Sequence, residues 1–193
     1  MQQKLLLISL VFIIFGYGCK DDQSTTIATP AYLKAIVPYV QGQTFKYKAS
    51  GGGIINVTMN VSSHFQSQAA CSGCEETVVE KVRYSFNTNG GLMVEMNIDN
   101  RPIIFMTIWS PTENLQLGTG FDLMTANGTA TLLCNTGNQV CLPSVTLNGR
   151  TFTDVIELTN GNQPDKITRA YYNLQQGLVG FVYGNGLTYR LED

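Results

Sequence analysis

The chain has 193 residues, of which 44% are hydrophobic and only 13% are charged, and its formal net charge is −2. The hydrophobic share excludes a disordered protein, and the absence of clustered Lys or Arg that could follow a phosphate backbone argues against nucleic-acid binding. Since charged residues make up about 25% of an average globular protein, most of the polar surface must consist of uncharged side chains.

The first residues have the order and length of a signal peptide. Lys4 precedes an unbroken apolar run over residues 5–15. This run is too short to span a bilayer, for which a helix needs about 20 apolar residues, and it suits the apolar core of a signal peptide. Gly16 and Gly18 are small enough for the narrow subsites of a signal peptidase, and Cys19 follows directly.

Gly18 followed by Cys19 resembles the lipobox of bacterial lipoprotein precursors. In that family the cysteine receives a diacylglyceryl group and becomes the new N-terminus. The resemblance implies a signal peptide at residues 1–18, a lipid on Cys19 and a mature protein held at the outer membrane. The alternative is an ordinary secretory signal peptide that contains a cysteine.

Lys20, Asp21 and Asp22 resemble the surface-export signal of Bacteroidota-type lipoproteins, a Lys followed by two acidic residues near the lipidated cysteine. The resemblance implies the cell surface, and a solvated charged spacer on a periplasmic protein is the alternative. The polar residues that follow predict a flexible tether over residues 19–30, which would reach about 35 Å if fully extended. Residues 31–193 contain no linker or repeat and are expected to form one domain.

Alternating apolar and polar residues predict strands along this domain. Strands are expected near residues 44–50, 55–62, 78–86, 92–98, 129–134, 140–147, 152–158, 167–172, 178–183 and 187–191. Residues 103–109 are apolar throughout, which predicts burial on both faces. Residues 63–76 are expected to form a polar loop, and residues 110–128 an irregular crossing between two halves of the sheet.

The number and spacing of these segments predict the fold class. Roughly ten strands with turn signals every 8–12 residues indicate an all-β domain, either an antiparallel β-sandwich or a curved, partly open β-barrel. Little helix is expected beyond a turn near residues 32–35. Residues 145–155, 170–172, 177–181 and 187–191 are similar to uncharacterised β-rich lipoproteins of the same bacterial group, a resemblance that implies hairpins and no function.

With Cys19 assigned to the lipid, four cysteines remain: Cys71, Cys74, Cys134 and Cys141. An even number in an exported protein predicts disulfides. Local pairing is favoured, 71 with 74 and 134 with 141, where the second bond would staple a hairpin; crossed pairings stay open.

Two other uses of these cysteines are less well supported. A zinc site of four thiolates is disfavoured because six residues separate the second pair, whereas two to four are usual. A redox pair is disfavoured because Glu75 and Glu76 follow Cys74, and acidic neighbours raise a thiol pKa. We therefore expect no metal and no cofactor.

Candidates for catalysis are sparse. His64, the only histidine, is expected in a polar loop, and no Gly-x-Ser-x-Gly motif is present. Glu80 and Glu95 are predicted to be exposed strand carboxylates, and a glycosidase pair would require them to converge. Asn160, Asn162 and Asp165 do not fit the calcium-loop spacing of an EF-hand. We therefore expect a protein that is not an enzyme.

Aromatic residues are concentrated in the last two hairpins. Since neighbouring residues of a strand point to opposite faces, Tyr171 and Tyr172 are not both expected in the core. Together with Tyr183 and Tyr189 they are candidates for a surface that binds a glycan or a partner protein, although β-sheets are rich in tyrosine in any case.

The sequence thus predicts a membrane-anchored lipoprotein with a non-catalytic binding or structural role in the cell envelope. The alternative is a carrier of a lipid or other apolar ligand in a half-open β-barrel. If the protein is a carrier, we expect an apolar cavity of several hundred cubic ångströms, which is about the usual volume of a ligand pocket. A binding module predicts a filled core and exposed aromatic residues, and an enzyme predicts convergent carboxylates with a shifted pKa.

Overall fold

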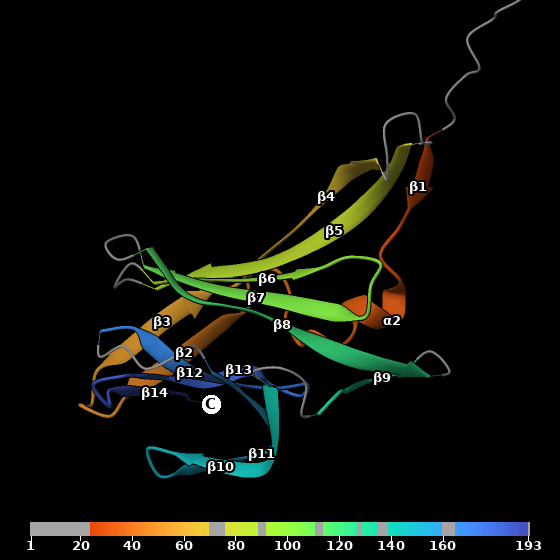
Figure 1. Cartoon of the computed structure of the whole chain (residues 1–193). Coiled ribbons are helices and arrows are strands. Elements are labelled where there is room, and N and C mark those ends of the chain that lie inside the picture. Colours follow the sequence, from red (N-terminus) through yellow and green to blue (C-terminus); the bar gives the residue numbers. More distant parts are fainter. Residues whose placement is uncertain are drawn as a thin grey trace, which may run out of the picture.

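The computed structural model describes residues 24–69, 76–88, 92–110, 114–126, 129–134, 139–159 and 165–192. These residues form two seven-stranded sheets that face each other, together with one short helix, α2 (Ala31–Lys34) (Figure 1). The sheets do not close into a barrel. The all-β prediction is therefore confirmed, with the sandwich as its architecture, and the helical turn expected near residues 32–35 is α2.

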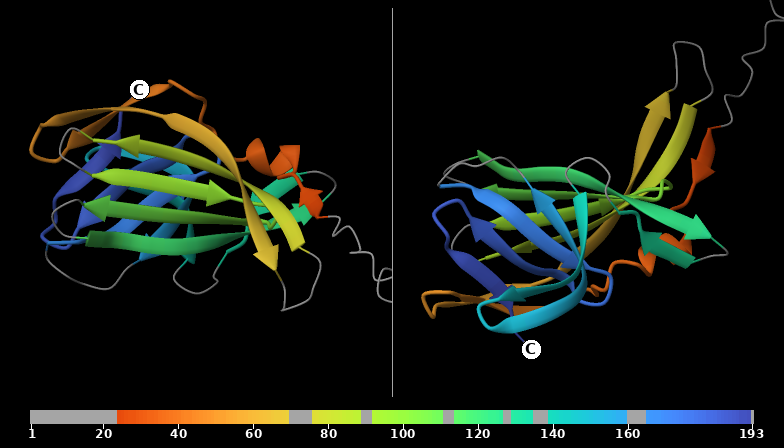
Figure 2. Two further views of the ribbon diagram at one scale, coloured as in Figure 1. Left: turned by 90° about the horizontal axis from the view of Figure 1, so that it is seen from above. Right: turned by 60° about the horizontal axis from the view of Figure 1, so that its bottom comes forward.

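Sheet 1 contains the only parallel strand pair among the described residues. Its strands in chain order are β1 (Thr25–Ile27), β4 (Asn60–Ala69), β5 (Glu76–Asn87), β6 (Met93–Ile98), β7 (Ile103–Ser110), β8 (Asn114–Ala126) and β9 (Thr129–Leu132). β1 runs parallel to the start of β5, and every other described pairing is antiparallel. β4 and the first half of β5 extend beyond the body of the sandwich and, with β1, form a projection that we call the arm (Figures 1 and 2).

Sheet 2 has the order β10-β11-β12-β13-β14-β2-β3. Its strands are β2 (Thr44–Ala49), β3 (Ile54–Thr58), β10 (Gln139–Leu147), β11 (Arg150–Thr159), β12 (Ile167–Asn173), β13 (Gly177–Tyr183) and β14 (Thr188–Leu191). Only the fully buried Met59 separates β3 from β4, so the chain passes directly from sheet 2 to sheet 1 at this residue.

Large aromatic side chains join the two sheets in the core. Tyr47 of sheet 2 stacks on Phe86 of sheet 1, with ring centroids 5.9 Å apart, and Phe121 of sheet 1 lies 5.0 Å from Tyr172 of sheet 2. The buried hydroxyl of Tyr47 donates a hydrogen bond to the Leu178 carbonyl at 2.8 Å. These pairs bury large apolar areas between the sheets, and the buried Tyr172 hydroxyl has no hydrogen-bond partner within the described residues.

The outer face of sheet 2 is covered by part of the same sheet. β11 pairs with β12 only from Ile156 to Thr159, and its first half turns away at Asp154, whose φ of 51° is unusual for a strand residue. This half and β10 fold over β13 and β14 as a unit that we call the covering hairpin. There Arg150 Nη1 donates to the Leu191 carbonyl at 3.0 Å, and Leu147 is buried.

The covering hairpin explains why one sequence prediction is wrong. Tyr171 and Tyr172 point to opposite faces of β12, yet they are only 3% and 0% exposed. Tyr172 faces sheet 1, whereas Tyr171 belongs to the face that the hairpin covers. Alternation along a strand predicts opposite faces correctly but does not tell whether the second face is covered.

Sheet 1 corrects three further predictions. The loop expected over residues 63–76 is strand as far as Ala69, and the irregular crossing expected over residues 110–128 contains the 13-residue β8. The run at residues 103–109 is buried on one face only: Ile104, Met106 and Ile108 point inward, whereas Phe105 and Trp109 are 38% and 40% exposed. The described chain therefore has 14 strands, more than the ten expected.

Candidate functional site

The N-terminal segment is attached to the arm through a buried carboxylate. Glu80 Oε2 accepts a hydrogen bond from the Thr29 backbone N–H at 2.9 Å, and Thr29 Oγ1 donates to the Glu80 carbonyl at 2.7 Å. Lys34 Nζ lies 2.9 Å from both carboxylate oxygens. The hydrogen bond from Lys34 lowers the Glu80 pKa, burial acts in the opposite direction, and the Thr29 N–H lowers it further. The prediction that Glu80 is exposed is wrong, since the residue is 8% exposed.

This attachment orders the second half of the expected tether. Residues 25–27 are β1, and Thr29 is buried, so residues 24–30 follow the arm. The described residues do not include Cys19, Lys20, Asp21 and Asp22. Cys19 precedes Ser24, at the arm tip, by five positions, and five residues span at most about 18 Å. Among the residues that the structure describes, no helix is long and apolar enough to cross a bilayer.

One of the two favoured disulfides is present. Cys134 and Cys141 are bonded, with their Cα atoms 5.2 Å apart. The bond does not staple a hairpin as expected, because β9 belongs to sheet 1 and β10 to sheet 2; it closes the connection between the sheets. Cys71 and Cys74 lie outside the described residues. Among the described residues, no group of three His, Cys, Asp or Glu side chains is placed to bind a metal ion.

The four tyrosines predicted as a binding surface do not form one. Tyr171 and Tyr172 are buried, and burial together with a hydrogen bond to Glu157 raises the pKa of Tyr171 to about 12. Tyr183 and Tyr189 are half-buried and pack against Phe181, with ring centroids 6.2 Å and 4.9 Å away. These residues stabilise sheet 2.

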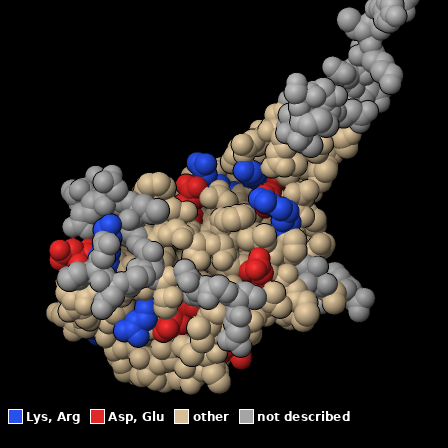
Figure 3. Space-filling model, viewed as in Figure 1, with Lys and Arg blue, Asp and Glu red and all other residues tan. Residues whose placement is uncertain are grey.

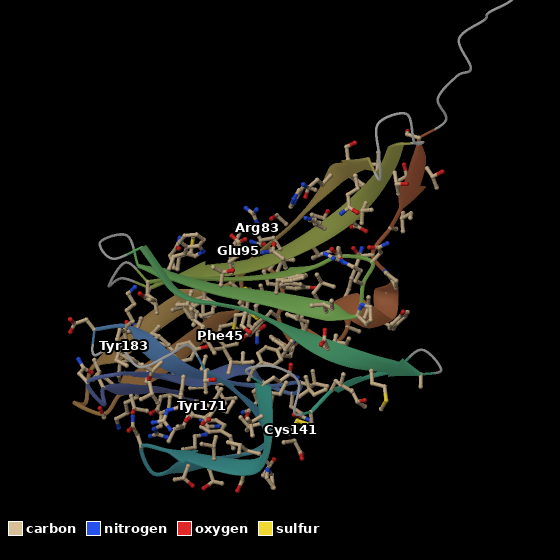
Figure 4. All side chains as sticks on the ribbon, in the orientation of Figure 1. Phe45, Arg83, Glu95, Cys141, Tyr171 and Tyr183 are labelled. Carbon is tan, nitrogen blue, oxygen red and sulfur yellow. A yellow bond between two sulfur atoms is a disulfide. The ribbon has the colours of Figure 1, made fainter. Side chains whose placement is uncertain are left out.

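The outer face of sheet 1 carries a polar hollow of about 340 Å³ at the base of the arm. We call it the polar hollow, and its lining comes from four adjacent strands and the turn after β6: His64 and Gln66 of β4, Lys81 and Arg83 of β5, Glu95, Asn97 and Ile98 of β6, Asp99 and Arg101 of the turn, and Phe105 of β7. His64 is exposed on a strand and not in a loop. Arg83 and Glu95 point away from sheet 2 (Figure 4), and basic and acidic side chains gather near the arm in Figure 3.

Strand register places a cation, an amide and an aromatic ring in one row across this hollow. Arg83 pairs with Asn97, Asn97 with Phe105, and Phe105 with Gly120. A Cβ atom added at Gly120 would lie 3.2 Å from the Phe105 ring, so the ring lies against bare backbone. Glycine at position 120 allows the Phe105 ring to pack flat against the sheet, and Phe105 still remains 38% exposed.

Ion pairs hold the acidic side chains of the hollow. Glu95 Oε1 lies 3.5 Å from Arg83 Nε and accepts a hydrogen bond from Asn97 Nδ2 at 2.8 Å. Asp99 accepts hydrogen bonds from the Arg101 backbone N–H at 2.8 Å and from its Nη2 at 2.7 Å. Burial raises the Asp99 pKa, but the bonds and charge of Arg101, with a smaller contribution from Lys81, outweigh it, and the net pKa is lowered.

Glu80 and Glu95 do not converge as a glycosidase pair requires. Glu80 contacts the N-terminal segment on the inner side of the arm, whereas Glu95 lines the outer hollow. Alternation could have revealed this, because Glu80 and the outward-facing Arg83 are separated by an odd number of positions on one strand. The position of Phe105 was hidden within an apolar run, yet a hairpin across residues 99–102 would have placed it opposite Asn97.

A second hollow, of about 530 Å³, lies where the chain passes from sheet 1 to sheet 2. Most of its lining is apolar, and we call it the apolar hollow: Leu132, Leu142, Pro143, Val155 and Leu174 surround it beside the Cys134–Cys141 bond. Asp154 also lines it. Sequence reasoning missed this hollow because its lining residues are distant in the chain.

Comparison of the chain with protein-family models, with curated proteins and with solved structures finds no match. The function therefore has to be argued from the two hollows and the arm.

Proposed function

We propose that this protein is an exported lipoprotein, anchored through Cys19, that binds a saccharide in the polar hollow without catalysing its conversion. The observation that carries the proposal is the row formed by Arg83, Asn97 and Phe105. Saccharides combine hydroxyl groups with C–H faces, and an exposed ring beside planar hydrogen-bonding side chains is complementary to both.

The composition of the hollow favours a saccharide over a protein partner. The centre of a protein interface is depleted in charged residues, whereas this hollow is lined by five charged side chains: Lys81, Arg83, Glu95, Asp99 and Arg101. Trp109 follows Phe105 on the same face of β7, about 13 Å along the strand, and extends the aromatic surface for a longer ligand.

The electrostatics support binding over hydrolysis. A glycosidase of the usual kind needs one carboxylic acid with a raised pKa to protonate the leaving group. Asp99 has a lowered pKa and accepts hydrogen bonds from Arg101, so it is an ionised acceptor at neutral pH. Its role in the hollow is to orient Arg101.

The proposal is tested by titrating oligosaccharides into the mature protein, purified from membranes in detergent, by calorimetry. Phe105→Ala should weaken binding about tenfold, as expected for an aromatic contact worth about 1.4 kcal/mol. The control is Phe65→Ala, which removes an exposed ring of β4 outside the hollow. Equal affinities of wild type and Phe105→Ala would exclude the hollow as the saccharide site.

The cellular address has two separate tests. Mass spectrometry of the mature protein should show an acylated Cys19, and an N-terminus at another residue would exclude the anchor. Protease treatment of intact cells should remove the protein from the surface if Lys20, Asp21 and Asp22 act as an export signal. Replacing Lys20, Asp21 and Asp22 by alanine should then protect the protein from the protease. If the protein is periplasmic, both the wild type and this variant would be protected.

The apolar hollow supports a second candidate function, a carrier of an apolar molecule. Its volume of about 530 Å³ lies in the range of ligand pockets. Asp154 in its lining would repel an anionic head group, so the expected ligand is uncharged or carries an amine. Leu174→Trp should fill the hollow and abolish the fluorescence gain of bound 1-aminoanthracene. Val140→Trp, at an exposed position outside the lining, is the control.

A further inference from the structure

The polar hollow has an excess of positive charge on a chain whose formal net charge is −2. Three cations, Lys81, Arg83 and Arg101, stand against two carboxylates, Glu95 and Asp99. Because the chain as a whole is acidic, this local excess reflects the arrangement of the hollow and not the average composition.

Pairing leaves the excess charge on Lys81. Glu95 is held by Arg83 and Asn97, and Asp99 is held by Arg101. Within the described part of the chain, Lys81 Nζ has no carboxylate within 4.0 Å, although its charge contributes to lowering the Asp99 pKa. Because Arg83 and Arg101 already pair with the two carboxylates, the Lys81 ammonium group is available to bind an anion.

The position of Lys81 fits a ligand that also contacts Phe105. Lys81 precedes Arg83 by two residues on the same face of β5, about 7 Å away, and β7 with Phe105 lies two strands, or about 10 Å, across the sheet. The path between them passes Asn97. A saccharide lying across β5, β6 and β7 would place one ring on Phe105 and the opposite end beside Lys81.

We propose that the saccharide carries an anionic group, a carboxylate or a sulfate, which the Lys81 ammonium binds beside Arg83. The inference rests on the proposed saccharide site and specifies its ligand class. A charge-assisted hydrogen bond from lysine is stronger than a neutral one, and because Lys81 is only partly buried, salt screens its charge. The anion therefore adds affinity and makes binding depend on ionic strength.

The test uses oligogalacturonate and its methyl ester, which share one backbone and differ in charge. The mature protein should bind the acid about tenfold more tightly than the ester at low ionic strength, a preference that added salt reduces. Lys81→Gln should bring the acid down to the affinity of the ester. Lys46→Gln, which removes an exposed cation from sheet 2, should leave the preference intact. A sulfated oligosaccharide in parallel distinguishes sulfate from carboxylate.

The outcomes separate this inference from the proposal beneath it. Equal affinities for acid and ester, or an unchanged preference in Lys81→Gln, would overturn the anionic ligand while Phe105→Ala still weakens both. The expected pattern is about tenfold weaker binding of both forms in Phe105→Ala, and loss of the acid preference alone in Lys81→Gln. Failure of every oligosaccharide to bind would overturn both the saccharide site and its anionic ligand.

Discussion

The two sheets differ in what lies over their outer faces. Over β12 and β13 of sheet 2 the covering hairpin buries Tyr171 and Gly180, and apart from Arg169 and Tyr183 every residue of these two strands is buried. Over β5, β6 and β7 of sheet 1 nothing described is packed, and this face carries cations, carboxylates, an amide and the exposed rings of Phe105 and Trp109. Sheet 2 therefore buries part of its second face, whereas sheet 1 leaves that face uncovered among the described residues.

Two glycines test this difference, and the first should give the largest effect. A Cβ at Gly180 would lie 2.5 Å from both Leu147 Cδ1 and the Tyr189 carbonyl oxygen. Because that oxygen belongs to backbone, Gly180→Ala must displace β14 or the covering hairpin and should lower the free energy of unfolding by about 3 kcal/mol. Urea denaturation measures the loss.

Gly120→Ala is the matched substitution on sheet 1. Its Cβ would meet the ring of Phe105 at 3.2 Å, and this exposed side chain is able to move. The expected cost is below about 1 kcal/mol. Equal losses in the two variants would contradict the view that only sheet 2 is covered.

The sequence predicted local features of both sheets and missed what depends on distant contacts. Alternation located β2 and β6 closely, and cysteine spacing identified the Cys134–Cys141 bond. The burial of Tyr171 depends on a hairpin that turns at Asp154, and the backbone of a single residue in the left-handed region leaves no periodic signal.

The candidate site was only partly predictable for the same reason. Lys81, Arg83 and Asn97 stand at polar positions of alternating strands, so their exposure could be inferred. Their alignment with Phe105 depends on the registers of β5, β6 and β7, and the apolar run from Ile103 to Trp109 gave no indication of which residues face outward.

Breaking the link between the sheets should have the second-largest effect. The Cys134–Cys141 bond closes a loop of eight residues, and its replacement in the Cys134→Ser, Cys141→Ser double variant should cost about 2.5 kcal/mol through the entropy of the unfolded chain. Urea denaturation measures this loss.

The double variant also separates the two hollows. Both cysteines line the apolar hollow, so 1-aminoanthracene binding should weaken, whereas the polar hollow of sheet 1 should keep its saccharide affinity. A parallel loss of saccharide binding would show that the outer face of sheet 1 depends on the connection to sheet 2.

The smallest effect concerns two carboxylates on opposite faces of sheet 1. Glu80→Gln removes the charge that holds Lys34 and Thr29 and should cost about 1 kcal/mol at neutral pH, a modest value because the Lys34 side chain is 39% exposed. Glu95→Gln, in a partly exposed pair whose closest atoms are 3.5 Å apart, should cost less than about 0.5 kcal/mol.

The pH dependence of unfolding tests the contribution of the buried Glu80 carboxylate. The folded-state pKa of Glu80 is below its ordinary 4.5, so the unfolded chain takes up a proton first as the pH falls. The stability contributed by Glu80 is therefore complete above pH 4.5 and is lost as the pH falls through the folded-state pKa. The difference between wild type and Glu80→Gln should shrink over that interval. A difference that stays constant down to pH 3 would mean that the charge of Glu80 does not hold the N-terminal segment, and that the strand pairing of β1 with β5 attaches it to the arm.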